Sequence, residues 1–480
     1  MVEETQQRNG TADDPETRPR EVVAVAGDPL EEGFSDSLHD LVDLVESGDL
    51  EALDHFLGVL HANDLATLIG VLPRQLWPQV IVRLDVTRIS DLMEELPDHL
   101  RDDLAEHIPR RQLGEAIAEM ASDDAADVLA ALPQGLAGKI IRAMPREARH
   151  EVEALLEYPE DSAGGIMQVE LVAVPENATV EQTIEAVRAN ADEVSTLHFV
   201  YVVDDEQRLV GVLNLGALLL APADQPIHEL MKHTVRVVHP ELDQEDVARM
   251  FRRYDLVALP VVDDRGRLLG RIMHDDVVDV LEEEADEDIM HMAGAAVFEP
   301  DLVYTDRIFK ITSVRLPWLL ATLAGLTFPA LLVEAFQVSF PKMMALVPFI
   351  PVIGAMGGNI GGQSSTIIVR GFATGRVDFQ NLRGFLLKEF LVGLLMGVAC
   401  GLLVAVVATL WHGDPMLSVT VAASMVMAMA TAAMLGVLVP FFFRLIKVDP
   451  AIAAGPLVTT INDTTAISIY YLTALLVFAG

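Results

Sequence analysis

Five long apolar runs dominate the last third of the chain. They cover about residues 316–336, 343–369, 389–411, 416–443 and 450–479. Each run is long enough to cross a hydrocarbon core, which needs roughly 20 helical residues. Five such runs in series argue against the buried core helices of a soluble protein. The pattern predicts an all-α transmembrane domain of five helices over residues 314–480.

A different periodicity precedes these runs. Residues 36–157 have the spacing of short amphipathic helices, interrupted at intervals of 24, 12, 24 and 12 residues by Pro73, Pro97, Pro109, Pro133 and Pro145. Proline is tolerated at helix starts and ends the helix before it. The pattern therefore predicts an all-α N domain of short helices stacked as a superhelix.

Two similar β-rich segments follow. Residues 202–211 and 261–270 share a Val-Val-Asp-Asp start and a Leu-x-Gly end, and Asp204 and Asp263 are 59 residues apart. Each segment has two predicted strands joined by a polar turn, with helical patterns on both sides. The repeat predicts two α/β units of the same fold and resembles a tandem pair of CBS domains, assigned to residues 158–281.

Charge separates the soluble part from the membrane part. The chain has a formal net charge of −39, yet only six acidic and eight basic residues follow residue 313. The first 313 residues therefore carry 66 acidic and 25 basic residues, a net charge of −41. Such a surface argues against nucleic acid, itself a polyanion, as a partner and favours cations.

Basic residues also predict the orientation in the membrane. Lys342 is alone on one side, and seven bases lie on the other: Arg315, Arg370, Arg376, Arg383, Lys388, Arg444 and Lys447. By the positive-inside rule, the N-terminal domains are cytoplasmic and the C-terminus is outside, in a plasma (inner) membrane. The N-terminus has no apolar signal segment, and residues 1–35 are predicted to be a disordered acidic extension.

The fifth apolar run contains an acid, Asp463, among several threonines and Asn462. An ionisable residue within a membrane helix is by default functional, so we favour an ion site over a protonated structural acid. Asp449 precedes Asp463 by 14 residues, which in one continuous helix would put both carboxylates on one side, roughly 21 Å apart. The second run is rich in glycine after Pro351, which fits either close helix packing or a hydrated-cation path.

A strongly acidic helix is predicted just before the membrane, within residues 282–313 and the end of the second CBS unit. Asp276, Asp279 and Glu283 share one helical face, and Glu284 begins a second face with Glu287 and Asp288. Like charges at these spacings destabilise a helix. The run is either a solvated face or a divalent-cation site, and oxygen-only ligands suit Mg2+ or Ca2+.

Three motifs together resemble the MgtE family of magnesium channels, over about residues 36–480. The Gly-rich segment 351–363 is similar to that family's pore motif, residues 158–167 to its junction before the CBS pair, and residues 449–463 to its last helix. The resemblance implies a homodimer in the lipid bilayer with the pore on the two-fold axis, and Mg2+ as both transported ion and regulatory ligand. It implies a pore ion site at Asp463 with Asn359, Gly358 and Thr459, and Asp449 at the cytoplasmic mouth.

The resemblance also implies regulatory Mg2+ sites that close the channel. The matching residues are Asp91, Asp123 and Asp127 in the N domain, Asp243, Glu245, Asp255, Asp276 and Asp279 in the second CBS unit, and Glu284, Glu287 and Asp288 on the gate helix. ATP at the CBS domains is doubtful, because Met273 stands where nucleotide-binding CBS domains have a hydroxyl residue, and the first unit has Asn214 and Ala217.

Two other functions remain open. One is a broader divalent cation transporter that also carries Co2+ or Mn2+, because oxygen ligands discriminate weakly between these ions. The other is a membrane-anchored CBS sensor that conducts nothing. An enzyme is not expected, because the sequence has no Walker A loop, no HExxH and no G-x-S-x-G motif.

Overall fold

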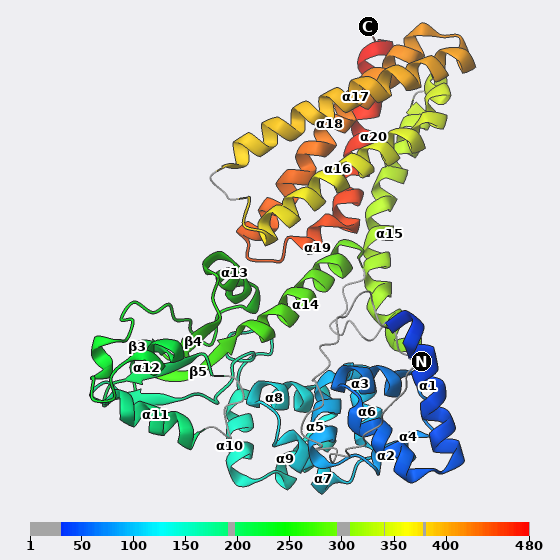
Figure 1. The fold of residues 1–480 in the computed structure, drawn as a ribbon. Coiled ribbons are helices and arrows are strands. Elements are labelled where there is room, and N and C mark those ends of the chain that lie inside the picture. The colour runs from blue at the N-terminus through cyan, green and yellow to red at the C-terminus, as the bar shows by residue number, and fades with distance from the viewer. Residues whose placement is uncertain (1–29, 191–196, 295–307, 340, 378–380, 480) are drawn as a thin grey trace, which may run out of the picture.

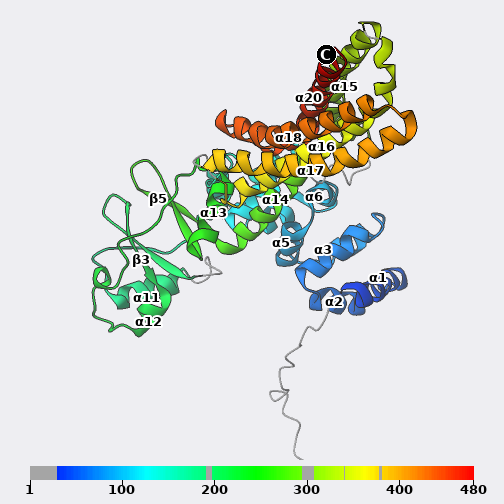
Figure 2. The ribbon, with the colours of Figure 1, turned by 90° about the horizontal axis from the view of Figure 1, so that it is seen from above.

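The computed structural model describes residues 30–190, 197–294, 308–339, 341–377 and 381–479. A bundle of long helices forms one end of the molecule, and a helical domain and an α/β domain lie side by side at the other (Figure 1). One helix, α14 (His274–Met292), runs from the α/β domain to the membrane helices (Figure 1), and Figure 2 shows the α/β domain and the helical domain side by side from above. Of the predicted extension 1–35, residues 1–29 lie outside the described part of the chain. Residues 30–35 belong to the first helix, which begins at Leu30.

The N domain is built from short helices in two rows. They are α1 (Leu30–Ser47), α2 (Leu50–Val59), α3 (Ala62–Val71), α4 (Trp77–Ile81), α5 (Val86–Glu95), α6 (Asp98–Ala105), α7 (Arg110–Ile117), α8 (Ser122–Ala131), α9 (Gln134–Ala143) and α10 (Arg146–Leu155). Helices two apart in sequence pack together, α3 on α5, α5 on α7 and α7 on α9, with α6, α8 and α10 as the second row. This arrangement confirms the predicted all-α N domain.

The regularly spaced prolines start helices. Pro97, Pro109, Pro133 and Pro145 are the N-cap residues of α6, α7, α9 and α10. A helix start leaves its first N–H groups without intrahelical partners, so proline loses nothing there. Pro73 differs, because it begins a turn that leads into α4.

The α/β domain contains two similar units, which confirms the CBS pair. The first has β1 (Ala173–Pro175), α11 (Val180–Ala189), β2 (Phe199–Val203), β3 (Leu209–Asn214), α12 (Leu215–Leu220) and η1 (Ile227–Glu229), and the second has α13 (Gln244–Tyr254), β4 (Ala258–Val262) and β5 (Leu268–Met273). The hairpins β2–β3 and β4–β5 are antiparallel, and each has one register shift at the equivalent Val-Val pair.

The two polar turns of the repeat have the same internal ion pair, and they are hydrogen-bonded to each other. Asp204 accepts from Arg208 at 2.8 Å, and Asp263 accepts from Arg267 at 2.7 Å. The Leu209 N–H donates to the Gly266 carbonyl at 2.9 Å, and the Leu268 N–H to the Gln207 carbonyl at 3.1 Å. These reciprocal bonds make the pair a pseudo-dimer of equivalent units.

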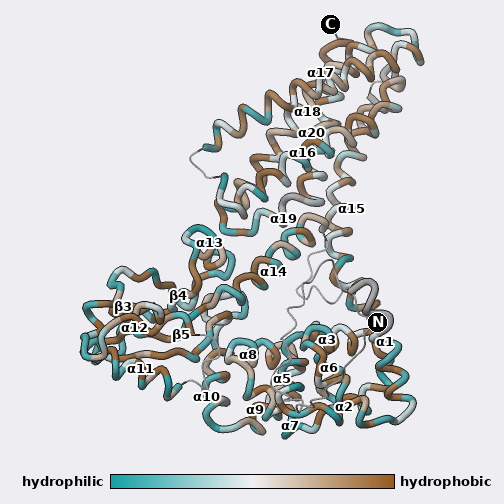
Figure 3. The backbone as a smooth tube through the Cα atoms, in the orientation of Figure 1, coloured by the Kyte–Doolittle hydropathy of each residue, from teal (hydrophilic) through white to brown (hydrophobic). Residues whose placement is uncertain are grey.

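In the part of the chain that the structure describes, five helices are long and apolar enough to cross a membrane. The membrane part consists of α15 (Ile308–Ser339), η3 (Pro341–Phe349), α16 (Ile350–Ala373), α17 (Leu382–His412), α18 (Pro415–Leu445), α19 (Ala451–Ala454) and α20 (Pro456–Ala479). Figure 3 shows these helices as mostly hydrophobic, whereas the helices of the soluble part alternate between hydrophobic and hydrophilic residues.

One expectation about these helices was wrong. The fifth apolar run is two helices, because Gly455 has ψ −123° and Pro456 begins α20, so Asp449 and Asp463 do not belong to one continuous helix. Pro351 lies in the first turn of α16 rather than in its interior, and the chain before it is the 3-10 helix η3. Proline is favourable in a first turn, so it frees no interior carbonyl there. The boundary predicted between residues 281 and 282 falls inside α14.

Small residues allow the membrane helices to approach one another. Gly393, Gly397 and Gly401 of α17 lie against the backbone of α18, and Gly436 of α18 lies against the Gly361 carbonyl of α16. Close backbone approach through small residues is the usual way for helices to pack in lipid. Helix α15 stands apart from this group and packs mainly on α20 (Figure 1).

Candidate functional site

A cavity of about 640 Å³ lies between α16 and α20, with Leu326 of α15 at its edge. Most of its wall is α16: Ile350, Pro351, Gly354, Ala355, Gly358, Asn359, Gly362 and Gln363. Helix α20 contributes Thr459, Asp463 and Ile467. The residues from α16 recur every three or four positions, so one face of this helix lines the cavity.

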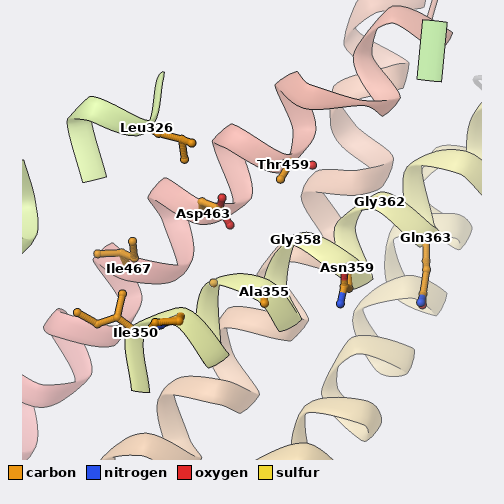
Figure 4. A pocket seen from close by; sticks show the side chains of 12 residues that line it. Leu326, Ile350, Ala355, Gly358, Asn359, Gly362, Gln363, Thr459, Asp463 and Ile467 are labelled. Atoms are coloured by element: carbon orange, nitrogen blue, oxygen red, sulfur yellow. The ribbon is translucent and has the colours of Figure 1, made fainter. Parts of the chain in front are cut away.

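Asp463 is the acid of this cavity. Its side chain is half-buried and points between α20 and the glycine-rich face of α16 (Figure 4). A methyl group added to Gly354 or Gly358 would lie 3.6 Å from Asp463 Oδ1. The two glycines therefore leave the carboxylate facing bare backbone, with room for a small polar occupant.

The other polar side chains that line the cavity stay uncovered in the single chain. Asn359, Gln363 and Thr459 are exposed, although they lie on helices that span the apolar part of the molecule. Asn359 and Gln363 extend from α16 in parallel, one turn apart, rather than toward Asp463 (Figure 4). Exposed amides at membrane depth are stable only beside water or another protein surface.

The neighbouring residue, Asn462, faces the other way. It is fully buried and packs against Gly361 of α16, where any side chain on residue 361 would overlap it. A second membrane acid, Glu389 of α17, is also buried and accepts a 2.7 Å hydrogen bond from Ser364. Neither residue lines the cavity, so Asp463 is its acidic member.

Asp449 lies against the C-terminal end of α14, the predicted acidic helix. Its Oδ2 is 2.7 Å from His291 Nδ1, and the other ring nitrogen of His291 is 3.5 Å from Glu287 Oε1. The hydrogen bond to Asp449 raises the pKa of His291, against the opposing effect of its partial burial. Burial, reinforced by Asp449 and Glu245, raises the pKa of Asp288 to about 6.

A second acidic group lies where α14 meets the N domain. Burial is the main cause of its raised pKa values: well above the ordinary value for Asp123, and about 7 for Asp124, Asp127 and Asp276. Neighbouring carboxylates raise these values further, since Asp276 acts on Asp123 and Glu283 acts on Asp127. Helix α14 and the N domain therefore bring several partly buried acids together, and the basic residues nearby do not balance their negative charge.

Four other predicted ligands lie on α14 or at the start of α13, and most of them already have a partner within the protein. Asp279 and Glu284 lie on α14, and both have a pKa raised by burial, to about 7 for Glu284, which also accepts 2.8 Å from Gln244. Asp243 caps α13 by accepting from the Glu245 N–H at 2.8 Å. Glu245 forms an ion pair with Arg249 at 3.3 Å.

Two predicted ligands stand apart from these groups. Asp91 is partly exposed on α5 and pairs with Arg88 at 3.8 Å. Asp255 is exposed and ends α13 in a left-handed conformation, with φ 49°. Among the described residues, no three His, Cys, Asp or Glu side chains converge closely enough to form a direct metal-binding group.

The sequence reasoning missed several members of these clusters. Asp124 and Glu94 join the acids at the N domain. His291 was also missed, although it follows Glu287 by one helical turn. The adjacent Asp123-Asp124 pair and the i, i+4 spacing of Glu287 and His291 are the signals that could have found them.

Comparisons with known proteins agree with this architecture. Family models match the MgtE intracellular N domain at residues 60–161, CBS domains at 163–224 and 227–283, and the MgtE divalent cation transporter at 350–473. The magnesium transporter MgtE of Thermus thermophilus is 36% identical over 435 residues, which is 90% of this chain and 96% of that protein. The magnesium transporter MgtE of Bacillus subtilis is 28% identical over 90% of this chain and 95% of its own length.

Among solved structures, the cytosolic domain of the Mg2+ channel MgtE in complex with ATP is 35% identical, with a TM-score of 0.49, and the match covers 51% of this chain and 99% of that one. Fold and site define a polytopic cation transporter that carries its own CBS module. The chain belongs to the MgtE family of divalent cation transporters.

Proposed function

We propose that this protein is a Mg2+-selective uptake channel of the plasma membrane that cytoplasmic Mg2+ closes. One observation carries the proposal: a carboxylate, Asp463, faces a glycine-lined cavity between two membrane helices, and the other polar side chains that line this cavity are uncovered. Mg2+ dehydrates reluctantly and keeps several waters, so its path needs room and hydrogen-bond acceptors rather than a tight cage. The cavity volume of about 640 Å³ suits a hydrated ion.

The complete pore belongs to a homodimer. One chain offers a single cavity acid and leaves Asn359, Gln363 and Thr459 exposed, whereas two chains around a two-fold axis would enclose these side chains and supply two carboxylates. Helix α15 supports the same assembly. Most of its residues are exposed, and within the single chain it packs mainly on α20, so a second chain has a free helix surface to contact.

Regulation follows from the acids at the ends of α14. The raised pKa values of Asp124, Asp127 and Asp276 mean that their ionised forms are unfavourable in this arrangement. A divalent cation relieves that repulsion, so Mg2+ stabilises the arrangement in which α14 lies between the N domain and the membrane helices. Loss of Mg2+ then releases α14, and the channel opens.

The regulatory ions would keep most of their water. Acids occur in the clusters as pairs from different elements, such as Asp127 with Glu283 and Asp288 with Asp449, rather than as converging triplets. Paired carboxylates that contact the water shell suit Mg2+ better than Zn2+, which takes four direct ligands. We assign the regulatory role to Asp123, Asp127, Asp276, Glu284, Glu287 and Asp288 together with Asp449.

The orientation rests on the basic residues. Arg370, Arg376, Arg444 and Lys447 lie at the end of the bundle that α14 approaches, and Arg252 of α13 donates to the Ala373 carbonyl at 3.2 Å. The positive-inside rule makes this side cytoplasmic. The C-terminal end of α20 is then outside the cell.

The experiment that tests this function is Mg2+ entry into proteoliposomes, followed with an internal Mg2+-sensitive dye. The variant Asp463→Asn keeps size and removes the charge, and we expect uptake to fall at least about a hundredfold because intramembrane acids on an ion path are functional. Asp414→Asn is the matched control, because Asp414 only caps α18, accepting from the Met416 N–H at 2.9 Å, and asparagine caps equally well.

Three results would change the assignment. Uptake by Asp463→Asn equal to that of the wild type would remove the carboxylate from the ion path. Equal uptake of Mn2+ or Co2+ would make the protein a broader divalent cation transporter. Absence of uptake by folded, dimeric wild type at low Mg2+ would favour the non-conducting CBS sensor.

A further inference from the structure

The last turn of α14 sits in a socket formed by the membrane domain. We define the socket by Val369 of α16, Ala451 of α19, and Gly455 and Pro456 at the start of α20. Met292 packs against Val369 and Ala451, which are almost completely buried. Figure 1 shows α14 reaching the membrane helices at α19. The end of the gate helix therefore contacts the membrane domain through apolar side chains as well as through acids.

Two glycines make this approach possible. A Cβ at Gly455 would overlap the Met292 carbonyl oxygen and would lie 3.4 Å from the His291 carbonyl. Gly294 ends the helix with φ 67°, a conformation that favours glycine, and lies against the Pro456 ring. At Gly455 the backbone that leads into α20 therefore meets the backbone of α14 directly, and at Gly294 the chain that follows α14 packs on the Pro456 ring.

The socket joins the two helices that line the cavity. Val369 lies on α16 ten residues after Asn359, and Pro456 begins α20 seven residues before Asp463, roughly 10 Å along the helix axis. A rigid contact with both helices fixes their cytoplasmic ends relative to each other. Movement of α14 out of the socket would release both ends together.

We propose that this socket is a metal-independent latch, which holds the end of α14 against α16 and α20 and sets the closed-to-open equilibrium on which Mg2+ acts. The inference rests on the proposed function and adds a residue-level coupling to it. The latch contacts are apolar and backbone contacts of Met292, Gly455 and Gly294. Mg2+ binding adds to the closed-to-open equilibrium that the protein has without Mg2+. If a weaker latch makes the open state more populated without Mg2+, a higher Mg2+ concentration is needed to close the channel.

The test measures the Mg2+ concentration on the cytoplasmic face that halves uptake into proteoliposomes. For Met292→Ala and Gly455→Ala we expect this concentration to rise about tenfold, the equivalent of about 1.4 kcal/mol, with uptake at low Mg2+ unchanged. Gly384→Ala is the matched control, because nothing lies within 4 Å of a Cβ at that position of α17. The control should match the wild type.

A third variant separates the latch from general damage to the fold. Met292→Leu keeps an apolar side chain of similar volume and should retain the wild-type inhibitory concentration. Unchanged inhibition in both Met292→Ala and Gly455→Ala would overturn the latch and leave the channel assignment intact. A tenfold rise in Met292→Leu or in Gly384→Ala would also overturn it. Wild type that shows no uptake, or uptake that Mg2+ does not inhibit, would instead refute the proposed function.

Discussion

Glycines of α16 serve two different purposes, although they stand in one short segment. Gly354, Gly358 and Gly362 face the cavity, and a Cβ at these positions meets nothing closer than 3.6 Å. Gly357 and Gly361 face α18 and α20, and a Cβ at Gly361 would collide with Asn462. The same residue type therefore leaves the cavity open on one face of α16 and lets a neighbouring helix approach on the other.

This division predicts opposite outcomes for adjacent residues. Gly361→Ala overpacks the contact with Asn462 and should destabilise the membrane domain by about 1–3 kcal/mol. Gly362→Ala should leave stability unchanged, because nothing lies within 4 Å of its Cβ. Thermal unfolding of the two purified variants in detergent checks this. Equal melting temperatures for both variants and the wild type would contradict the packing role of Gly361.

The residue type alone could not separate these roles. The glycine run and Asp463 were recognisable because a dense glycine run marks a close approach within a membrane helix and an intramembrane acid is rare. Which glycine faces Asp463 depends on the rotation of α16, which packing against α18 sets. His291 was missed for a related reason, since its partner Asp449 is 158 residues away.

At the scale of elements, α14 connects the parts of the molecule. Its N-terminal half faces the N domain through Asp276 and Glu283, and its C-terminal end faces Asp449 and the socket. The sequence predicted an acidic helix here and placed a boundary at residue 282, but the structure has one helix from His274 to Met292. A strand end and a helix start can be inferred from local pattern, whereas the continuity of a helix between two domains depends on what it packs against.

The fifth apolar run shows the same limit. Its length and hydropathy predicted one membrane helix, and the break at Gly455 and Pro456 was not predicted. Glycine followed by proline is a recognised helix breaker, but an apolar run of nearly 30 residues outweighed it. The break matters because it lets Asp449 lie beside His291 rather than on the axis of α20.

The acids between α14 and the N domain predict a pH dependence of stability. Asp124, Asp127 and Asp276 have a pKa of about 7 in the folded protein, against about 4 in an unfolded chain. Between these values the native state binds more protons than the unfolded state, so stability falls as pH rises. Without Mg2+, the N domain should therefore melt at a lower temperature at pH 8 than at pH 6. Mg2+ should remove most of this difference, because it binds the ionised acids.

Trp77 of α4 can report this melting, because the other two tryptophans, Trp318 and Trp411, belong to membrane helices. Replacing both by phenylalanine leaves Trp77 as the fluorescence probe. K+ at equal ionic strength is the control for screening. A melting temperature that rises from pH 6 to pH 8 without Mg2+ would contradict the repulsion on which the regulation depends.

At the scale of the whole molecule, the proposed pore needs a second chain. The cavity has one acid and an uncovered polar wall, and α15 extends away from the other helices (Figure 1). We expect a dimer of two 52.3 kDa chains in mild detergent, measured by light scattering with the detergent mass subtracted. A monomer that still transports Mg2+ after reconstitution at one chain per vesicle would contradict the shared pore.

The central claim is that Mg2+ both permeates this protein and closes it from the cytoplasmic side. Current through inside-out patches, with Mg2+ as the external charge carrier, tests both parts in one recording. Raising Mg2+ on the cytoplasmic face should shut the current reversibly, and Asp463→Asn should carry none. Wild-type current that persists as cytoplasmic Mg2+ rises into the millimolar range, or current carried equally by Asp463→Asn, would contradict the account.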